Sequence, residues 1–161
     1  MTMGPKEKQE SVWDYPRPPR VERSDEMIEV WFAGVCVAHS RRTMRVLETS
    51  HPPTYYIPKA DVETTHLRRS PRRTMCEFKG QSHYYTVSVD GRSARNAVWE
   101  YPEPLPGYEA LKDHLCFYPS LMEQCLVNGE AVTPQEGDFY GGWITRRIVG
   151  PYKGGAGTWG W

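Results

Sequence analysis

The chain has 161 residues and a balanced charge, with 20 basic and 20 acidic side chains. This length predicts one domain that is large enough to bury a core without disulfides. The charge balance argues against nucleic acid or a membrane as the main partner, because both attract a basic surface. No apolar run approaches the roughly 20 residues that span a bilayer, and residues 1–10 lack the apolar core of a secretion signal. The sequence therefore predicts a cytoplasmic protein.

Chemistry-bearing motifs are scarce. The four cysteines include no C-x-x-C pair, which would indicate a zinc ribbon, and without a secretion signal we expect reduced thiols. A metal site built from His51, His83, His114 and Cys76 is conceivable, but no spaced ligand motif supports it. Neither a P-loop nor a G-x-G-x-x-G opening a helix is present, so we expect no metal and no cofactor.

The ends of the chain differ from its centre. Residues 1–11 are polar and predict a disordered leader. The proline-rich stretch 13–20 predicts an extended segment that its rings pin across the domain surface, with a peptide for a proline-binding module as the alternative. The main domain is expected to cover 12–152. Residues 153–161 predict an irregular tail rich in glycine and tryptophan.

Turn signals divide the centre of the chain into short strands. Asp90-Gly91 and Asn128-Gly129 are hairpin signals because a primed turn needs positive φ, and Ala33-Gly34 predicts a third compact turn. Further strands are indicated by β-branched and aromatic residues at 45–47, 54–57 and 74–78.

One short helix is expected at about 107–114, because Tyr108, Leu111 and Leu115 recur at helical spacing. A single turn is expected at 59–62. Several short strands and one helix indicate a mostly β, single-domain antiparallel sheet, resembling a small barrel.

Aromatic and ionisable residues occur together in four blocks, at 47–56, 76–80, 99–102 and 117–119. Each block lies at a predicted strand end or turn. Apolar walls with a few placed polar groups are the composition of a ligand pocket. The sequence therefore indicates a site without naming its chemistry.

The segment Glu48-Thr49-Ser50-His51 carries a carboxylate and an imidazole near a strand end. The two groups could act as acid and base, or they could satisfy a turn and face solvent. Glu48 is the stronger candidate because it follows the apolar pair Val46-Leu47.

The segment 76–80 is read as strand, with Cys76 and Phe78 on one face and Glu77 and Lys79 on the other. Cys76 could be a nucleophile or a small core residue. Lys79 could hold an anionic group, form a Schiff base, or lie on the surface in an ion pair.

Two tyrosine pairs, 55–56 and 84–85, should each direct one ring inward and one outward. Gly141-Gly142 lies between aromatic residues. It is read first as a turn and second as a lid that approaches a ligand closely.

The blocks Trp13-Asp14-Tyr15-Pro16, Leu47-Glu48-Thr49-Ser50-His51-Pro52-Pro53, Cys76-Glu77-Phe78-Lys79-Gly80, Trp99-Glu100-Tyr101-Pro102 and Phe117-Tyr118-Pro119 resemble the family called domain of unknown function number 427. The resemblance covers roughly residues 12–152 and implies a β-tent-like fold. The family's name places it near nucleotidyltransferases, although this chain shows no paired aspartate motif and no phosphate cradle for such chemistry. Zinc sites of β-tent relatives use paired C-x-x-C motifs, so the resemblance implies no zinc here.

Three hypotheses of function follow. The first is an aromatic pocket that binds a small polar or zwitterionic metabolite with a flat apolar part, through a Glu48–Lys79 pair. The second is an enzyme that uses Glu48 as acid or base with Lys79 or Cys76. The third is an interaction module or homodimer formed through the tryptophan-rich ends. The expected ligand-binding residues, marked by the family pattern, are Ser50, Tyr56, Tyr84, Trp99, Tyr101 and Tyr118.

Overall fold

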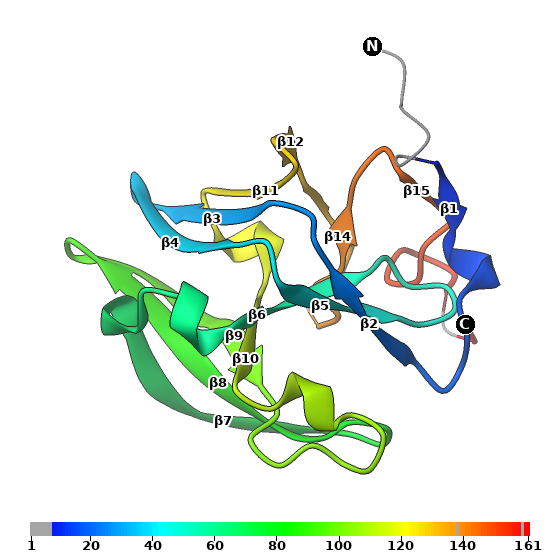
Figure 1. Cartoon of the computed structure of the whole chain (residues 1–161), viewed down its shortest axis with the longest axis horizontal. Helices are drawn as coiled ribbons and strands as arrows, with labels where there is room; N and C mark the ends of the chain where they lie inside the picture. The colour runs from blue at the N-terminus through cyan, green and yellow to red at the C-terminus, as the bar shows by residue number, and fades with distance from the viewer. Residues whose placement is uncertain (1–7, 138, 159) are drawn as a thin grey trace.

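The computed structural model describes residues 8–137, 139–158 and 160–161. Its main parts are a seven-stranded antiparallel sheet and a four-stranded antiparallel sheet, joined by two ribbons of two strands (Figure 1). The strands are β1 Glu10–Ser11, β2 Arg20–Ser24, β3 Ile28–Phe32, β4 Val35–Ser40, β5 Thr43–Leu47, β6 Thr54–Pro58, β7 Leu67–Cys76, β8 Gly80–Val89, β9 Arg92–Glu100, β10 His114–Phe117, β11 Gln124–Val127, β12 Glu130–Ala131, β13 Thr133–Pro134, β14 Trp143–Ile144 and β15 Ile148–Val149.

The helical elements are single 3-10 turns. They are η2 Val12–Asp14, η3 Lys59–Asp61, η4 Thr64–His66, η5 Glu109–Leu111 and η6 Pro119–Leu121. No helix in the described ranges is long and apolar enough to cross a membrane.

The large sheet has the order β2-β5-β6-β10-β9-β8-β7, and the small sheet has the order β12-β11-β3-β4. The prediction of a mostly β antiparallel domain is therefore confirmed. The large sheet is open, because β2 and β7 form its two edges, so the molecule is not a closed barrel.

All three predicted turns connect paired strands. The dipeptides 33–34, 90–91 and 128–129 join β3 to β4, β8 to β9 and β11 to β12. Both residues of each dipeptide have positive φ, which is the geometry of a type I′ hairpin turn. Sequence therefore determines these connections locally.

The main core fills the space between the two sheets. Ile28 and Val30 of β3 pack there against Tyr55 and Ile57 of β6, and Trp143 of β14 is fully buried among them. The alternate side chains of β6 point to the opposite face of the large sheet, where a second apolar cluster forms. The large sheet is thus covered on both faces.

The expected helix at 107–114 is not formed. Only Glu109–Leu111 make a 3-10 turn, Asp113 has a φ of +61°, and β10 begins at His114. Leu115 pairs with Ile57 of β6 instead of completing a helical face. The pairing of β10 with β6 on one side and β9 on the other therefore overrides the helical spacing of this segment. The single turn expected at 59–62 is present as η3.

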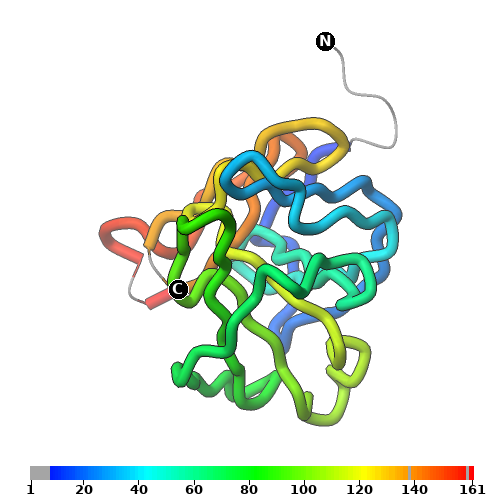
Figure 2. Tube along the Cα trace, turned by 90° about the vertical axis from the view of Figure 1, so that its left-hand side faces the viewer, coloured from blue at the N-terminus to red at the C-terminus, as the bar shows by residue number. Residues whose placement is uncertain are grey.

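Strands β1 and β15, near the two ends of the described chain, lie side by side on the right of Figure 1, the side that faces away from the viewer in Figure 2. Strand β1 pairs in parallel with β15, so ordered structure starts before residue 12, where the leader was expected to end. Residues 1–7 of that leader lie outside the described ranges. The region after residue 139 is not wholly irregular, because it includes β14 and β15, while the described part of 153–161 contains turns only.

Candidate functional site

A row of side chains crosses four strands on the face of the large sheet that lies away from the small sheet. Trp99 of β9 is the register partner of Tyr84 on β8 and of Cys116 on β10. In the same register, Cys116 lies opposite Tyr56 of β6. Because side chains directly opposite one another in a sheet are neighbours, four strands build one continuous aromatic floor.

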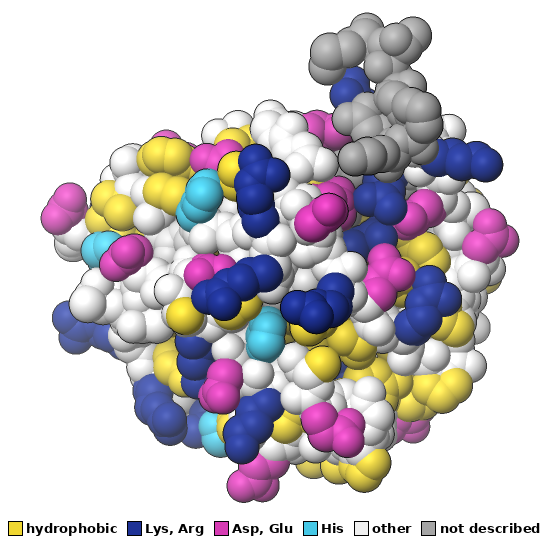
Figure 3. Space-filling view, viewed as in Figure 1, with side chains coloured by type: hydrophobic (Ala, Val, Ile, Leu, Met, Phe, Trp, Pro, Cys, Tyr) yellow, Lys and Arg dark blue, Asp and Glu magenta, His cyan; other side chains and the backbone are white. Residues whose placement is uncertain are grey.

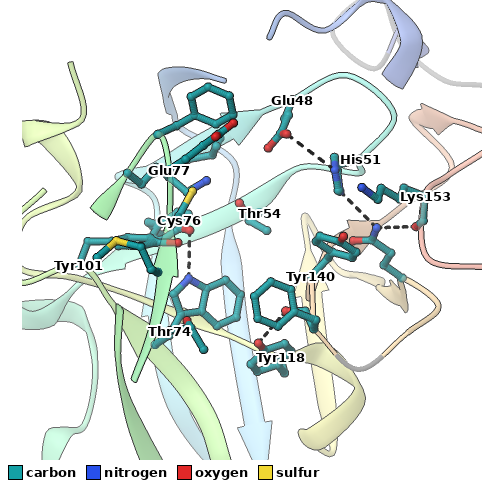
Figure 4. A pocket seen from close by; sticks show the side chains of 18 of the residues that line it. Glu48, His51, Thr54, Thr74, Cys76, Glu77, Tyr101, Tyr118, Tyr140 and Lys153 are labelled. Atoms are coloured by element: carbon teal, nitrogen blue, oxygen red, sulfur yellow. Dashed lines mark hydrogen bonds and ion pairs between the residues drawn. The ribbon is translucent and has the colours of Figure 1, made fainter. Parts of the chain in front are cut away.

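A pocket of about 220 Å³ lies over this floor. Its walls come from the β5–β6 loop, the β7–β8 turn, the loop between β13 and β14, and the C-terminal segment (Figure 4). Eight of the nine site residues that we expected from sequence line it: Glu48, Tyr56, Cys76, Lys79, Tyr84, Trp99, Tyr101 and Tyr118.

The aromatic rings hold one another in place. The indole Nε1 of Trp99 donates to the Tyr56 hydroxyl at 3.1 Å, and the Trp99 and Tyr118 ring centres are 4.6 Å apart. The Tyr118 hydroxyl donates to the Phe139 carbonyl at 2.7 Å, which fixes the β13–β14 loop over the pocket. These contacts leave few rotamers to the lining and preorganise it for a ligand.

Two tyrosines of the pocket differ in acidity. Burial raises the pKa of Tyr56 well above its usual value. Burial also acts to raise the pKa of Tyr84, but hydrogen bonds to neighbouring hydroxyls, chiefly Thr74, outweigh it and lower that pKa. Tyr84 and Thr74 are 3.0 Å apart.

Glu48 does not pair with Lys79. Its Oε2 lies 3.4 Å from Nε of Arg17 and 3.8 Å from Nε2 of His51. Arg17 comes from the N-terminal segment, where its guanidinium also donates to the carbonyl of Thr49 at 2.8 Å. The negative charge of Glu48 is therefore already compensated by Arg17.

Lys79 lies in the turn between β7 and β8 and is only 8% exposed. Its Nζ lies 5.8 Å from the ring centre of Tyr101, close enough for a cation–π contact. Within the part of the chain that the structure describes, Lys79 forms no ion pair with a carboxylate. A mostly buried lysine without a counter-ion is unfavourable, so Lys79 is an uncompensated positive charge of the pocket.

A second ammonium enters from the C-terminal segment. The Nζ of Lys153 lies 5.2 Å from the ring centre of Tyr140, and Lys153 also lines the pocket. The same Tyr140 ring contacts the imidazole of His51, with 4.8 Å between the ring centres. Figure 4 shows Lys153 and His51 on one side of the pocket.

The protonation of His51 follows from its neighbour Gln135. The Gln135 Oε1 accepts from the Gly142 amide and its Nε2 donates to the Lys153 carbonyl, so the orientation of the amide group is fixed. The same Nε2 lies 3.4 Å from Nδ1 of His51, so Nδ1 must accept and Nε2 must carry the proton. Burial first, and then the charges of Lys153, Arg17 and Lys79, lower the pKa of His51 to about 4.

Two expectations about site residues are corrected. Residues 77–79 form the β7–β8 turn, so strand alternation does not apply, and Cys76 to Lys79 all line the pocket. Ser50 lies outside the pocket. It is fully buried with a φ of +70°, and its backbone bonds Val12 and Lys153.

The tyrosine pairs alternate as expected, but the sheet has no free face for the second ring of the 55–56 pair. Tyr56 faces the pocket, whereas Tyr55 is buried in the main core. In the other pair, Tyr84 lines the pocket and Tyr85, on the opposite face, donates its hydroxyl to Glu100.

The conceivable metal ligands do not come together. His83 lies near Gln81 on β8, and the Nδ1 of His114 is 2.8 Å from the Lys112 carbonyl, while only His51 and Cys76 reach the pocket. Across the described ranges no group of three or more metal-binding side chains forms.

Four residues of the site were not expected there: Arg17, Gln135, Tyr140 and Lys153. All four come from the two ends of the chain. Gly141-Gly142, read first as a turn, forms none and lies in the β13–β14 loop. A Cβ on Gly141 would lie 2.8 Å from Tyr118, so the loop packs closely on the aromatic floor. No pattern in the sequence marked Arg17, Gln135 or Lys153.

The fold and the site define a small, mostly β domain with an aromatic pocket on one face of an open sheet. The chain belongs to the family described as domain of unknown function DUF427, whose model matches residues 20–128. The resemblance noted from sequence is therefore confirmed. No curated protein matches the chain. The matched residues include Glu48 and Lys79 and the aromatic floor, whereas Arg17, Gln135, Tyr140 and Lys153 lie outside the match.

Proposed function

We propose that the pocket binds a small planar molecule that carries a negative charge. The observation that supports this most strongly is Lys79, which is 8% exposed in an aromatic pocket and has no acidic partner in the described ranges. A bound anion would supply the missing counter-charge, and the buried setting would strengthen the attraction.

The size of the pocket limits the ligand. A dry cavity of about 150 Å³ accepts benzene, so about 220 Å³ accommodates one six-membered ring with a small substituent. The rings of Trp99, Tyr101 and Tyr118 offer faces and edges on which such a ring can stack.

The charges favour an anion over a zwitterion. A zwitterion would need a free carboxylate in the pocket to hold its positive group. Glu48 is already compensated by Arg17. Glu77 lines the pocket but is exposed, so solvent screens its charge and weakens its hold on a positive group. Lys79 offers a positive charge that an anionic ligand can neutralise.

Binding is also supported better than acid–base catalysis by Glu48 and His51. The one lone pair of the neutral imidazole is directed at Gln135, so His51 has no basic nitrogen free for a substrate. Glu48 already faces the Arg17 guanidinium, so its carboxylate is engaged in an ion pair and is not free to contact a substrate.

The test compares three probes of one size: benzoate, benzenesulfonate and benzylamine. We expect both anions to raise the melting temperature at pH 7.5 and benzylamine to have no effect. Calorimetric titration should show that Lys79→Met weakens anion binding by about tenfold or more, the effect of losing a charge-assisted hydrogen bond.

The matched control is Lys112→Met, because Lys112 is an exposed lysine away from the pocket. It should bind as the wild type does. Benzylamine binding as tightly as benzoate, or full anion affinity in Lys79→Met, would show that the proposed function is wrong.

A further inference from the structure

A second lysine, Lys153, lines the pocket, and three contacts determine where it lies. Its amide donates to the Ser50 carbonyl at 2.8 Å, its carbonyl accepts from Gln135 at 2.6 Å, and its Nζ lies over Tyr140. Clamping of the backbone on both sides fixes where this side chain begins. The backbone of Lys153 is therefore held at the pocket wall, and its side chain lies over the Tyr140 ring.

Lys153 also has no carboxylate partner among the residues for which the structure gives contacts. Three cations, Arg17, Lys79 and Lys153, thus lie around a pocket that two carboxylates, Glu48 and Glu77, also line. Arg17 compensates Glu48, and Glu77 is exposed, so solvent screens its charge. Lys79 and Lys153 are left as two ammonium groups without an ion pair in the described ranges. Burial is the main cause of the lowered pKa of His51, and the charges of Lys153, Arg17 and Lys79 lower it further, which agrees with cations on this side of the pocket.

The excess charge belongs to the pocket and not to a broad surface field. On the face seen in Figure 3, basic and acidic side chains are interspersed, and the chain as a whole is neutral. A pocket with two uncompensated ammonium groups in a neutral protein selects for the charge of a small ligand.

We infer that the ligand is an aromatic anion with two negative charges, and that Lys153 determines specificity by recognising the second charge. This inference rests on the proposed function, since it assumes that Lys79 binds the first charge. Both an aromatic phosphate monoester and an aromatic dicarboxylate have the required chemistry. Lys153 lies outside residues 20–128, so this preference is a property of the C-terminal segment and not of the part matched by the family.

The experiment uses the full chain and pairs of probes that differ in charge but little in shape. Phenyl phosphate is compared with benzenesulfonate, and terephthalate with benzoate. Titrations are run at pH 8, where a phosphate monoester with a second pKa of about 6 is doubly charged. Each probe is measured on the wild type, Lys153→Met, Lys79→Met and the exposed control Lys112→Met.

We expect at least one doubly charged probe to bind about tenfold more tightly than its singly charged partner. Lys153→Met should remove that difference and leave the affinity for benzenesulfonate and benzoate nearly unchanged. The probe that shows the larger difference identifies whether the two charges share one head group or lie at opposite ends of the ring.

The two proposals fail in different ways. If the singly charged probes bind through Lys79 but neither doubly charged probe binds more tightly, the inference is overturned and the proposed function stands. Equal loss for both charge states in Lys153→Met also overturns the inference, because Lys153 would then not discriminate charge. If no probe binds the wild type at millimolar concentration, both proposals are wrong.

Discussion

The carboxylate of Glu48 is paired with Arg17 and not with Lys79, with 3.4 Å between Nε of Arg17 and Oε2 of Glu48. Arg17 lies in a segment that precedes the family match, and Lys79 lies within the match. The N-terminal segment therefore sets the charge balance of a pocket whose floor is built by the sheet. Four predictions follow from this and related contacts.

The first prediction concerns the stability of the ligand-free protein. Lys79→Met replaces a charged side chain that is 8% exposed and forms no ion pair in the described ranges with an apolar chain of similar length. We expect the free energy of unfolding to rise by about 1 kcal/mol, because such replacements of buried charges are often stabilising. Urea denaturation measures this, with Lys112→Met as the control. A clear loss of stability would mean that Lys79 has a compensating partner.

The second prediction concerns the close approach of Gly141. A Cβ there would lie 2.8 Å from Cδ1 of Tyr118 and 2.9 Å from Cη2 of Trp99, and its φ is +69°. Gly141→Ala should therefore displace the β13–β14 loop, lower stability by about 2 kcal/mol and weaken anion binding.

Gly34→Ala is the matched control for this substitution. Gly34 has a φ of +79°, but a Cβ there would meet no atom within 4 Å. It should show only the backbone cost of about 1 kcal/mol and bind anions normally. Equal effects of the two substitutions would indicate that the contacts of Gly141 with the rings are unimportant.

The sequence correctly predicted those features of the fold that are determined by residues adjacent in the chain. The turns at 33–34, 90–91 and 128–129 need positive φ, which each dipeptide supplies by itself, and all three are present. The helix at 107–114 was predicted from local spacing, but Leu115 is held by pairing with Ile57, a contact across 58 positions that no local pattern reports.

The same distinction between local and long-range contacts applies to the candidate site. Residues of the aromatic floor were recognisable because they occur in blocks at strand ends. The partner of Glu48 was not, because Arg17 reaches it through the path of the N-terminal segment. Lys153 is likewise placed by its bonds to Ser50 and Gln135, which depend on how the C-terminal segment folds back.

The third prediction concerns acid unfolding and the contacts that join the two ends of the chain. The Oε1 of Glu10 accepts from Arg45 at 2.8 Å and from Tyr15 at 2.7 Å, and its Oε2 accepts from Arg147 at 2.7 Å. Burial acts to raise the pKa of Glu10, but these hydrogen bonds and charges outweigh it and lower the pKa from 4.5 to about 2.

Because the pKa of Glu10 is lower in the folded state, its contribution is complete above about pH 4.5 and is lost as the pH falls towards 2. Glu10→Gln should be less stable than the wild type at pH 7 by about 2 kcal/mol, since it leaves the buried Arg45 less compensated. Denaturant titrations from pH 6 to 2 should show the difference shrinking with acid. Glu63→Gln, at an exposed position, is the control, and a difference that stays constant with pH would contradict the prediction.

The fourth prediction concerns a different pH range and the imidazole of His51. Burial and the charges of Lys153, Arg17 and Lys79 lower its pKa from 6.5 to about 4, so the unfolded chain binds more protons between these values. Stability should therefore be constant above about pH 6.5 and should fall as the pH drops to about 4, by at most about 3 kcal/mol from this group. His51→Gln should flatten the curve between pH 6.5 and 4.5, above the range in which Glu10 titrates, whereas exposed His39→Gln should not. An unchanged slope in His51→Gln would show that burial and the cations around the pocket do not hold the imidazole neutral.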